Sequence, residues 1–174
     1  MKHISRSLII SGFPGVGKTE FANRFKQTND SLSVIELDSR NYSKLPTGEL
    51  HPDFPINYIE AIELASETHD IILISSHDCV RELLMEKNIY HVIAFPYLGL
   101  KELYLDRYRQ NGKSESEINQ LNKLWRQWFD GVIRVGSCPF YILTEENSTL
   151  ISIYPIILST LSLNPSKYPL PEIN

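Results

Sequence analysis

One segment of the sequence combines residue types and spacing that are typical of phosphate binding. Residues 12–19 read Gly-Phe-Pro-Gly-Val-Gly-Lys-Thr, a complete G-x-x-x-x-G-K-T pattern. Glycines let the backbone curl so that successive N–H groups point at phosphate oxygens. Lys18 can bring a cation to the β- and γ-phosphates of a nucleoside triphosphate, and the Thr19 hydroxyl can ligate Mg²⁺. The residues predicted to hold the nucleotide are Gly12, Pro14, Gly15, Val16, Gly17, Lys18 and Thr19.

The elements around this segment follow the alternation of a parallel α/β sheet. Short apolar runs predict strands at residues 7–11, 33–37, 70–75, 91–95 and 140–143. Amphipathic stretches predict helices at residues 17–26, 55–67, 80–87, 100–109, 116–132 and 149–161. Each strand is nearly continuously apolar, so we expect a five-stranded parallel sheet covered on both faces. The pattern then lies between the first strand and the first helix, whose positive N-terminal end adds to phosphate binding.

With these elements, residues 4–162 resemble the small P-loop kinases of the nucleotide and nucleoside kinase-like group, including kinases of the phage type. The resemblance implies a P-loop NTPase fold with a helical lid, and ATP with Mg²⁺ as cofactors. It also implies transfer of the γ-phosphate to a nucleoside, a nucleoside monophosphate or a related small molecule. We expect a single domain over residues 1–174, with an acceptor-side flap at about 39–57, a lid at about 104–128 and an irregular tail at 164–174.

Asp38 follows the second predicted strand and is the strongest candidate outside the phosphate pattern. The carboxyl ends of parallel strands face the ligand crevice, so Asp38 should lie near the γ-phosphate. There it can accept a proton from an acceptor hydroxyl or help to hold Mg²⁺. Relatives that phosphorylate small alcohols carry an aspartate here, so the resemblance also implies a base. The alternative is that Asp38 caps the next turn.

The flap that follows is rich in aromatic, polar and proline residues. Arg40, Tyr42 and Phe54 are predicted to contact the acceptor, the two aromatic rings by stacking on a base or ring. In the alternative interpretation Arg40 is solvated surface, and the segment is a surface loop anchored by Phe54.

The third predicted strand ends without the acidic residue that hydrolytic P-loop ATPases use to hold magnesium through water. It ends in Ser75 and Ser76, which, like Asp78 at a predicted helix cap, are candidate replacements for that acid. This segment touches the acceptor in many small kinases, so His77 and Arg81 are predicted contacts. A role in the core or on the surface remains the alternative for both.

The predicted lid carries two arginines at the end of one helix. Arg107 and Arg109 are predicted catalytic residues, because guanidinium groups stabilise the charge of a transferring phosphoryl group. They are two positions apart, so only one faces the phosphates in an intact helix. Arg126 is a third candidate. The alternative is that these arginines have no catalytic role and are cations favoured by the helix dipole near a helix C-terminus. The resemblance places the adenine at residues 144–147, contacted through backbone atoms.

Local patterns also predict how the lid's second helix begins and packs. Ser114 and Glu117 form a capping box at its start. A stripe at helical spacing is expected to pack inward, and it consists of Ile118, Leu121, Trp125, Trp128 and Val132.

Composition limits the remaining function classes. The 174 residues are 42% hydrophobic and 22% charged with a formal charge of −4, which disfavours a basic nucleic-acid coat. Cys79 and Cys138 lack metal-ligand spacing, and we expect both side chains to be buried in the protein. So few cysteines also indicate a reducing compartment. No run reaches the ~20 apolar residues of a membrane span, and the N-terminus lacks signal-peptide shape, so we expect a cytoplasmic protein without membrane contact.

The predicted partner is a small-molecule or nucleotide acceptor. A nucleotide-dependent binding or switch protein is the alternative from another class. A kinase acting on a modified base in DNA is less favoured, because backbone binding depends on lysine and arginine.

Overall fold

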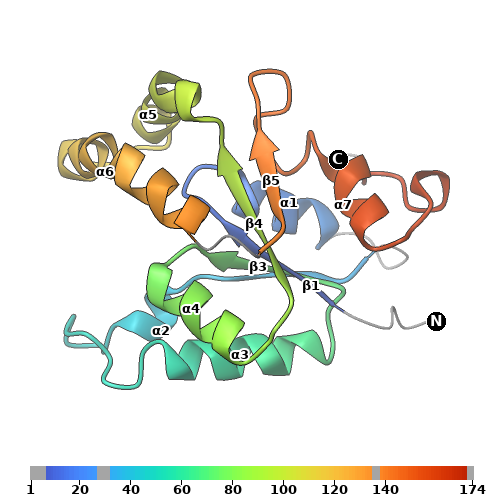
Figure 1. The fold of residues 1–174 in the computed structure, drawn as a ribbon, viewed down its shortest axis with the longest axis horizontal. Coiled ribbons are helices and arrows are strands. Elements are labelled where there is room, and N and C mark those ends of the chain that lie inside the picture. The colour runs from blue at the N-terminus through green and yellow to red at the C-terminus, as the bar shows by residue number, and fades with distance from the viewer. Residues whose placement is uncertain (1–6, 27–31, 135–137, 172–174) are drawn as a thin grey trace.

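The computed structural model describes residues 7–26, 32–134 and 138–171 (Figure 1). Its strands are β1 (Leu8–Gly12), β2 (Val34–Leu37), β3 (Ile71–Ser75), β4 (His91–Pro96) and β5 (Phe140–Leu143). They form one five-stranded sheet in the order β2-β3-β1-β4-β5, and every pairing is parallel. The predicted α/β class and five-stranded parallel sheet are therefore confirmed.

The strand order places the phosphate pattern at the middle of the sheet. β1 is the central strand, and Gly12 at its end is in register with Ser75 of β3 and Ala94 of β4. The chain therefore leaves β1 at the carboxyl edge with β2 and β3 on one side and β4 and β5 on the other. This division decides which candidate residues share each half of the site.

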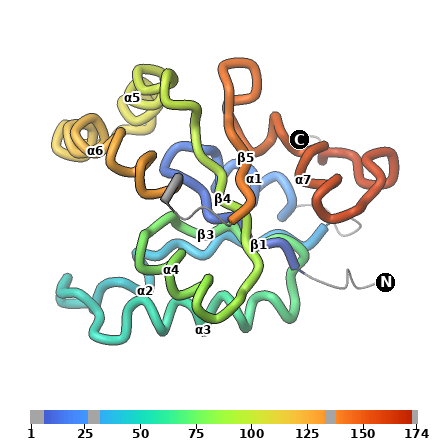
Figure 2. Tube along the Cα trace, in the orientation of Figure 1, coloured from blue at the N-terminus to red at the C-terminus, as the bar shows by residue number. Residues whose placement is uncertain are grey.

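Seven α-helices and two short 3-10 helices are seen in the described ranges. The α-helices are α1 (Lys18–Phe25), α2 (Arg40–Ser43), α3 (Ile56–Ser66), α4 (Asp78–Glu86), α5 (Lys101–Gln110), α6 (Glu115–Arg134) and α7 (Tyr154–Thr160). The 3-10 helices are Leu98–Leu100 and Pro165–Lys167. In the tube view α2, α3 and α4 lie along one side of the molecule, and α5 and α6 project together above the sheet (Figure 2).

Two apolar cores hold these layers together, one on each face of the sheet. On one face, Tyr58 and Ile62 of α3 and Leu84 of α4 pack against Ile72. On the other face, α1, α5, α6 and α7 bury a larger cluster around Ile10. Removal of these apolar side chains from water is the main force that holds the helices on the sheet.

Burial differs between the central and the edge strands. β1 and β4 are buried along their whole length, and β3 is buried up to Ser75. The edge strand β2 is only half-buried, and Phe140 of β5 is 57% exposed. The prediction that all five strands are covered on both faces is therefore wrong at the edges. Phe140 and Ile142 lie on one face of β5 and are 57% and 46% exposed, so that face is not covered there.

All six predicted helices are present, with shifted starts. α7 begins at Tyr154 rather than near Thr149, because residues 150–153 form turns, and α4 begins at Asp78 instead of residue 80. The four-residue α2 inside the flap was not predicted. The predicted irregular tail contains the short 3-10 helix and is described to Pro171.

The local predictions for the second lid helix are confirmed. Ser114 N donates to Glu117 Oε2 at 2.9 Å, and Glu117 N donates to Ser114 Oγ at 3.3 Å. Of the predicted stripe, Ile118, Leu121, Trp125 and Val132 are buried and Trp128 packs partly buried against them.

The prediction for the cysteines is wrong for one of them. Cys79 is exposed on the first turn of α4, because the buried face of that helix is formed by the neighbouring Val80 and by Leu84. Cys138 is partly buried, and its thiol donates to the His91 carbonyl at 3.2 Å.

Candidate functional site

The segment after β1 is a tight loop that only glycine can build at several positions. Gly15 and Gly17 have φ of 86° and 85°, a region that side chains disfavour. A Cβ atom at Gly12 would lie 2.9 Å from Lys18 Cδ and 2.9 Å from Val16 Cγ2. The loop therefore needs glycine for the left-handed turns and for the close passage of the Lys18 side chain.

Lys18 folds back over the loop. Its Nζ donates to the Gly12 carbonyl at 2.8 Å and to the Phe13 carbonyl at 3.3 Å. Burial lowers the pKa of Lys18 to about 8, although the carboxylates of Glu36 and Asp38 act in the opposite direction. The ammonium therefore lies at the loop, close to two acidic side chains of the β2 region.

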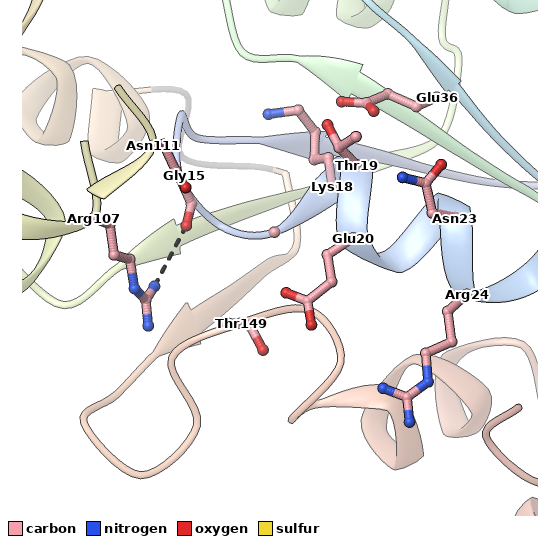
Figure 3. Close-up of a pocket in the computed structure, with 11 residues that line it drawn as sticks. Gly15, Lys18, Thr19, Glu20, Asn23, Arg24, Glu36, Arg107, Asn111 and Thr149 are labelled. Carbon is pink, nitrogen blue, oxygen red and sulfur yellow. Dashed lines mark hydrogen bonds between the residues drawn. The ribbon is translucent and has the colours of Figure 1, made fainter. Parts of the chain in front are cut away.

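A cleft of about 770 Å³ opens beside this loop (Figure 3). The loop and α1 form one wall, with Lys18 and Thr19 on it, and Glu36 projects from β2. The opposite side carries Arg107 and Thr149. The cleft is also lined by Gly15, Gly17, Glu20, Asn23, Arg24 and Asn111.

The two lid arginines are in different environments. Arg107 donates to the Gly15 carbonyl at 3.4 Å and to the Ser148 carbonyl at 2.7 Å, and its guanidinium lies 4.9 Å from the centre of the Tyr104 ring. Arg109 donates to Asp106 at 2.5 Å, and both of these side chains are at least half exposed. The structure therefore brings Arg107, and not Arg109, to the loop. Arg126 is exposed.

An aromatic cluster joins the loop to the two lid helices. Phe13 is buried and makes edge contacts with Tyr104 of α5 and with Trp125 and Trp128 of α6. The ring-centre distances to Trp125 and Trp128 are 5.3 Å each. Both ends of the predicted lid, 104–128, thus belong to the core. The exposed part lies around the turn between α5 and α6.

The chain after β5 forms a further wall of the cleft. Leu150 N donates to the Val16 carbonyl at 2.9 Å, which holds this segment against the loop. Residues 144–147, where adenine was expected, form a turn closed by Thr144 N donating to the Asn147 carbonyl at 3.1 Å. The residue of this segment that lines the cleft is Thr149, which follows the turn.

Asp38 lies at the carboxyl end of β2 and is engaged by Arg40. Arg40 Nε donates to both carboxylate oxygens, at 3.1 and 2.9 Å, and Arg40 Nη2 donates to Oδ2 at 2.5 Å. Arg40 N also donates to Oδ1 at 2.9 Å, which is the turn-capping bond considered as the alternative. These hydrogen bonds lower the pKa of Asp38. Asp38 is therefore an ionised group that both caps a turn and acts electrostatically on Lys18.

The aromatic residues of the flap pack on one another. The Tyr42 and Phe54 rings contact the buried Tyr58 at 5.0 and 6.1 Å, and Phe54 makes an edge contact with His77 at 5.8 Å. His77 Nε2 and Ser39 Oγ are joined by a hydrogen bond of 2.9 Å. Phe54 thus anchors the flap as the alternative interpretation proposed, beside the ends of β2 and β3.

Arg81 is placed inside the protein. It is 3% exposed, its Nη1 donates to Ser76 Oγ at 2.6 Å, and its Nη2 donates to the Asp78 carboxylate. Its Nε has no hydrogen-bond partner in the described part of the chain. This placement matches the alternative of a core role for Arg81. The side chains of Ser76 and Asp78 both accept hydrogen bonds from Arg81.

Sequence reasoning missed Glu36 and Thr149. The available signal for Glu36 was a carboxylate within the otherwise apolar strand Val34-Ile35-Glu36-Leu37. Acidic side chains are rarely buried without a partner or a function. Thr149 carries no residue-level signal, because its position depends on the turn after β5.

The residues present fit a nucleoside triphosphate with Mg²⁺. The loop supplies backbone N–H groups and Lys18, and Thr19 and Glu36 in the cleft lining offer the oxygen ligands that Mg²⁺ prefers. Asp38 lies outside the cleft lining. Across residues 7–26, 32–134 and 138–171, no group of three or more His, Cys, Asp or Glu side chains could hold a metal alone. Phosphate oxygens and water normally complete such a magnesium shell.

Comparisons with known proteins give no family for the chain. No protein-family model matches it, and no curated protein matches it. Among solved structures, an uncharacterized protein from Eubacterium ventriosum ATCC 27560 aligns over 90% of this chain and 98% of its own, with 12% identity and a TM-score of 0.49.

Within the described ranges, none of the helices has the length and apolar character needed to cross a membrane.

Proposed function

We propose that this chain has a P-loop NTPase fold and is a kinase that transfers the γ-phosphate of ATP to a small-molecule acceptor. The observation that carries the proposal is the loop between β1 and α1. Its left-handed glycines and Lys18 lie at the mouth of a cleft whose other side carries Arg107. The loop offers several backbone donors, and Lys18 and Arg107 offer two cations, to a polyphosphate.

The division of the sheet supports transfer rather than binding alone. Arg107 and Thr149 lie on the β4–β5 side of the loop, whereas Asp38 follows β2 on the other side. A donor held by the loop would therefore present its terminal phosphate between Lys18 and the Asp38 side. An acceptor nucleoside, nucleoside monophosphate or related small molecule would enter from the β2–β3 half, next to the flap.

In the proposed reaction the acceptor oxygen bonds to the γ-phosphorus, the bond to the bridging oxygen breaks, and ADP leaves. Asp38 receives the acceptor proton as its general base. Lys18 and Arg107 stabilise the charge on the phosphoryl oxygens. Thr19 and Glu36 would hold Mg²⁺, which would neutralise phosphate charge when bound.

The direct test measures ADP release from ATP·Mg²⁺ with a panel of nucleosides, nucleoside monophosphates, small alcohols and DNA, and Lys18→Ala serves as the blank. Stimulation by one acceptor class supports the kinase. A flat, slow rate with intact ATP binding contradicts it, and supports the alternative of a nucleotide-dependent switch. Strongly salt-dependent stimulation by DNA would support a kinase acting on a base in DNA.

A further inference from the structure

The acceptor half of the proposed site has few cations to offer a phosphate group. A phosphorylated acceptor is normally held by arginine or lysine through charge-assisted, often bidentate hydrogen bonds. Three cation-forming side chains were candidates beside the ends of β2 and β3, namely Arg40, His77 and Arg81.

Arg81 cannot be reached by a bound acceptor. Only 3% of the residue is exposed, and its two terminal nitrogens are bonded to Ser76 and Asp78. Freeing it would break both of these side-chain hydrogen bonds.

His77 offers no positive charge at neutral pH. Burial lowers the pKa of His77, and the nearby Arg81 and Lys18 charges lower it further against the opposing effects of Asp78 and Asp38. Its Nε2 is already hydrogen-bonded to Ser39 Oγ, and its ring contacts Phe54. It can therefore orient a neutral acceptor but adds no cation for an anionic one.

Arg40 is exposed but committed to Asp38. The side chain is 75% exposed and donates three hydrogen bonds to that carboxylate. The carboxylates of Asp38, Glu117 and Glu36 all act electrostatically on Arg40, so acidic groups surround it. The other basic residues of the flap are the exposed Lys44 and His51, which contacts Asp53.

We propose that the acceptor is a hydroxyl compound that carries no phosphate group, recognised beside Asp38 and the aromatic flap. The inference rests on the proposed phosphotransferase activity and narrows its substrate class. The committed arginines and the nearby carboxylates disfavour a phosphomonoester dianion. Asp38 can receive the proton of a neutral acceptor hydroxyl when one of its hydrogen bonds from Arg40 opens.

The test compares acceptors in matched pairs that differ only by a phosphate. Several nucleosides are paired with their 5′-monophosphates, and several polyols are paired with their phosphate esters. We expect kcat/KM, from ADP release with ATP·Mg²⁺, to be at least about tenfold higher for the unphosphorylated member of the preferred pair, a difference of roughly 1.4 kcal/mol. A preference for the phosphorylated member would overturn this inference and leave the kinase standing.

A panel in which no member stimulates ADP release, while ATP still binds, would overturn the kinase and this inference with it.

The variant Arg40→Ala tests whether that arginine binds the phosphate of an acceptor. We expect KM for a phosphorylated acceptor to change by less than about threefold, as in the flap control Lys44→Ala. An increase of tenfold or more that is confined to phosphorylated acceptors would make Arg40 a phosphate ligand and overturn the inference.

Discussion

Arg107 donates a hydrogen bond of 3.4 Å to the backbone carbonyl of Gly15, although 92 positions separate the two residues in the chain. The same guanidinium donates to the Ser148 carbonyl at 2.7 Å and to Ser148 Oγ at 2.5 Å. One side chain thus joins the loop at residues 12–19, the helix α5 and the segment after β5.

The contrast between the two lid arginines gives the first prediction. Arg107→Ala should raise the Kd for ATP about 10-fold or more, since a hydrogen bond to a charged group contributes about 1.5–3 kcal/mol. Arg109→Ala should change it by less than about twofold, because its exposed pair with Asp106 contributes little. Equilibrium binding of a fluorescent ATP analogue measures both. Equal losses would show that Arg107 has no special role.

Lys18 supplies the second prediction. Lys18→Ala should weaken ATP binding by about 10-fold to 100-fold or more, because it removes the half-buried cation at the loop. Lys26→Ala is the matched control, since Lys26 is exposed just after α1 and bonds only Asn23 among the described residues. Calorimetric titration measures both variants, with circular dichroism as a check on folding. Binding by Lys18→Ala at the control level would contradict the loop assignment.

The pKa of Lys18 predicts a pH dependence of binding. Burial lowers this pKa to about 8, so the free protein has largely lost that proton at pH 9. Phosphate oxygens favour the charged form, so ATP should raise the pKa and binding at pH 9 should take up a proton. Affinity should therefore fall as pH rises above about 8. Calorimetry in buffers of different ionisation enthalpy measures the uptake, which Lys18→Met should abolish.

Substitution of Asp38 should affect phosphoryl transfer but not ATP binding. Asp38→Asn should lower the rate of phosphoryl transfer by about 10²–10⁴-fold, the usual contribution of a general base, and leave ATP affinity nearly unchanged. Single-turnover transfer and ATP titration measure the two effects. An unchanged transfer rate would exclude Asp38 as the base.

The Asp38–Arg40 pair also predicts the acid side of the pH–rate profile. Arg40 lowers the pKa of Asp38, so the base should stay ionised, and the activity present, down to a pH below the ordinary aspartate range. The activity should be lost as pH falls through that lowered pKa. Arg40→Ala should move the acid limb of kcat/KM to higher pH, while Lys44→Ala should not. An unmoved acid limb would mean that Asp38 is not the titrating group.

Phe13 gives a prediction for stability. Phe13→Ala should lower the free energy of unfolding by about 3–5 kcal/mol, because it empties the site packed by Tyr104, Trp125 and Trp128. Tyr97→Ala is the control, since Tyr97 is 59% exposed and should matter by about 0.5 kcal/mol or less. Urea denaturation measures both. A small effect at Phe13 would show that the loop does not depend on its contact with the lid helices.

Much of the fold could be predicted from local patterns. The apolar runs predicted all five strands to within one residue at each end, since a strand buried between helices is read directly from its composition. The capping box at Ser114 was equally local, because its two partners are three residues apart. α2 was missed because four residues carry too little periodicity to be recognised.

The candidate site was predicted only where its residues are close in sequence. The loop at residues 12–19 is such a case, because its conformation depends on glycines within eight positions of one another. The exposure of Cys79, the burial of Arg81 and the presence of Glu36 in the cleft all depend on neighbours from other elements.

By itself, the sequence determined the order of strands and helices along the chain and the loop with its lysine, because hydrophobic periodicity and glycine conformation act over a few residues. Only the tertiary structure decided that Arg107 reaches Gly15, that Arg109 stays with Asp106, and that Arg40 and Arg81 are held by carboxylates. The physical reason is that electrostatic pairing falls off with distance in space, and the distances between segments are set by packing around the sheet.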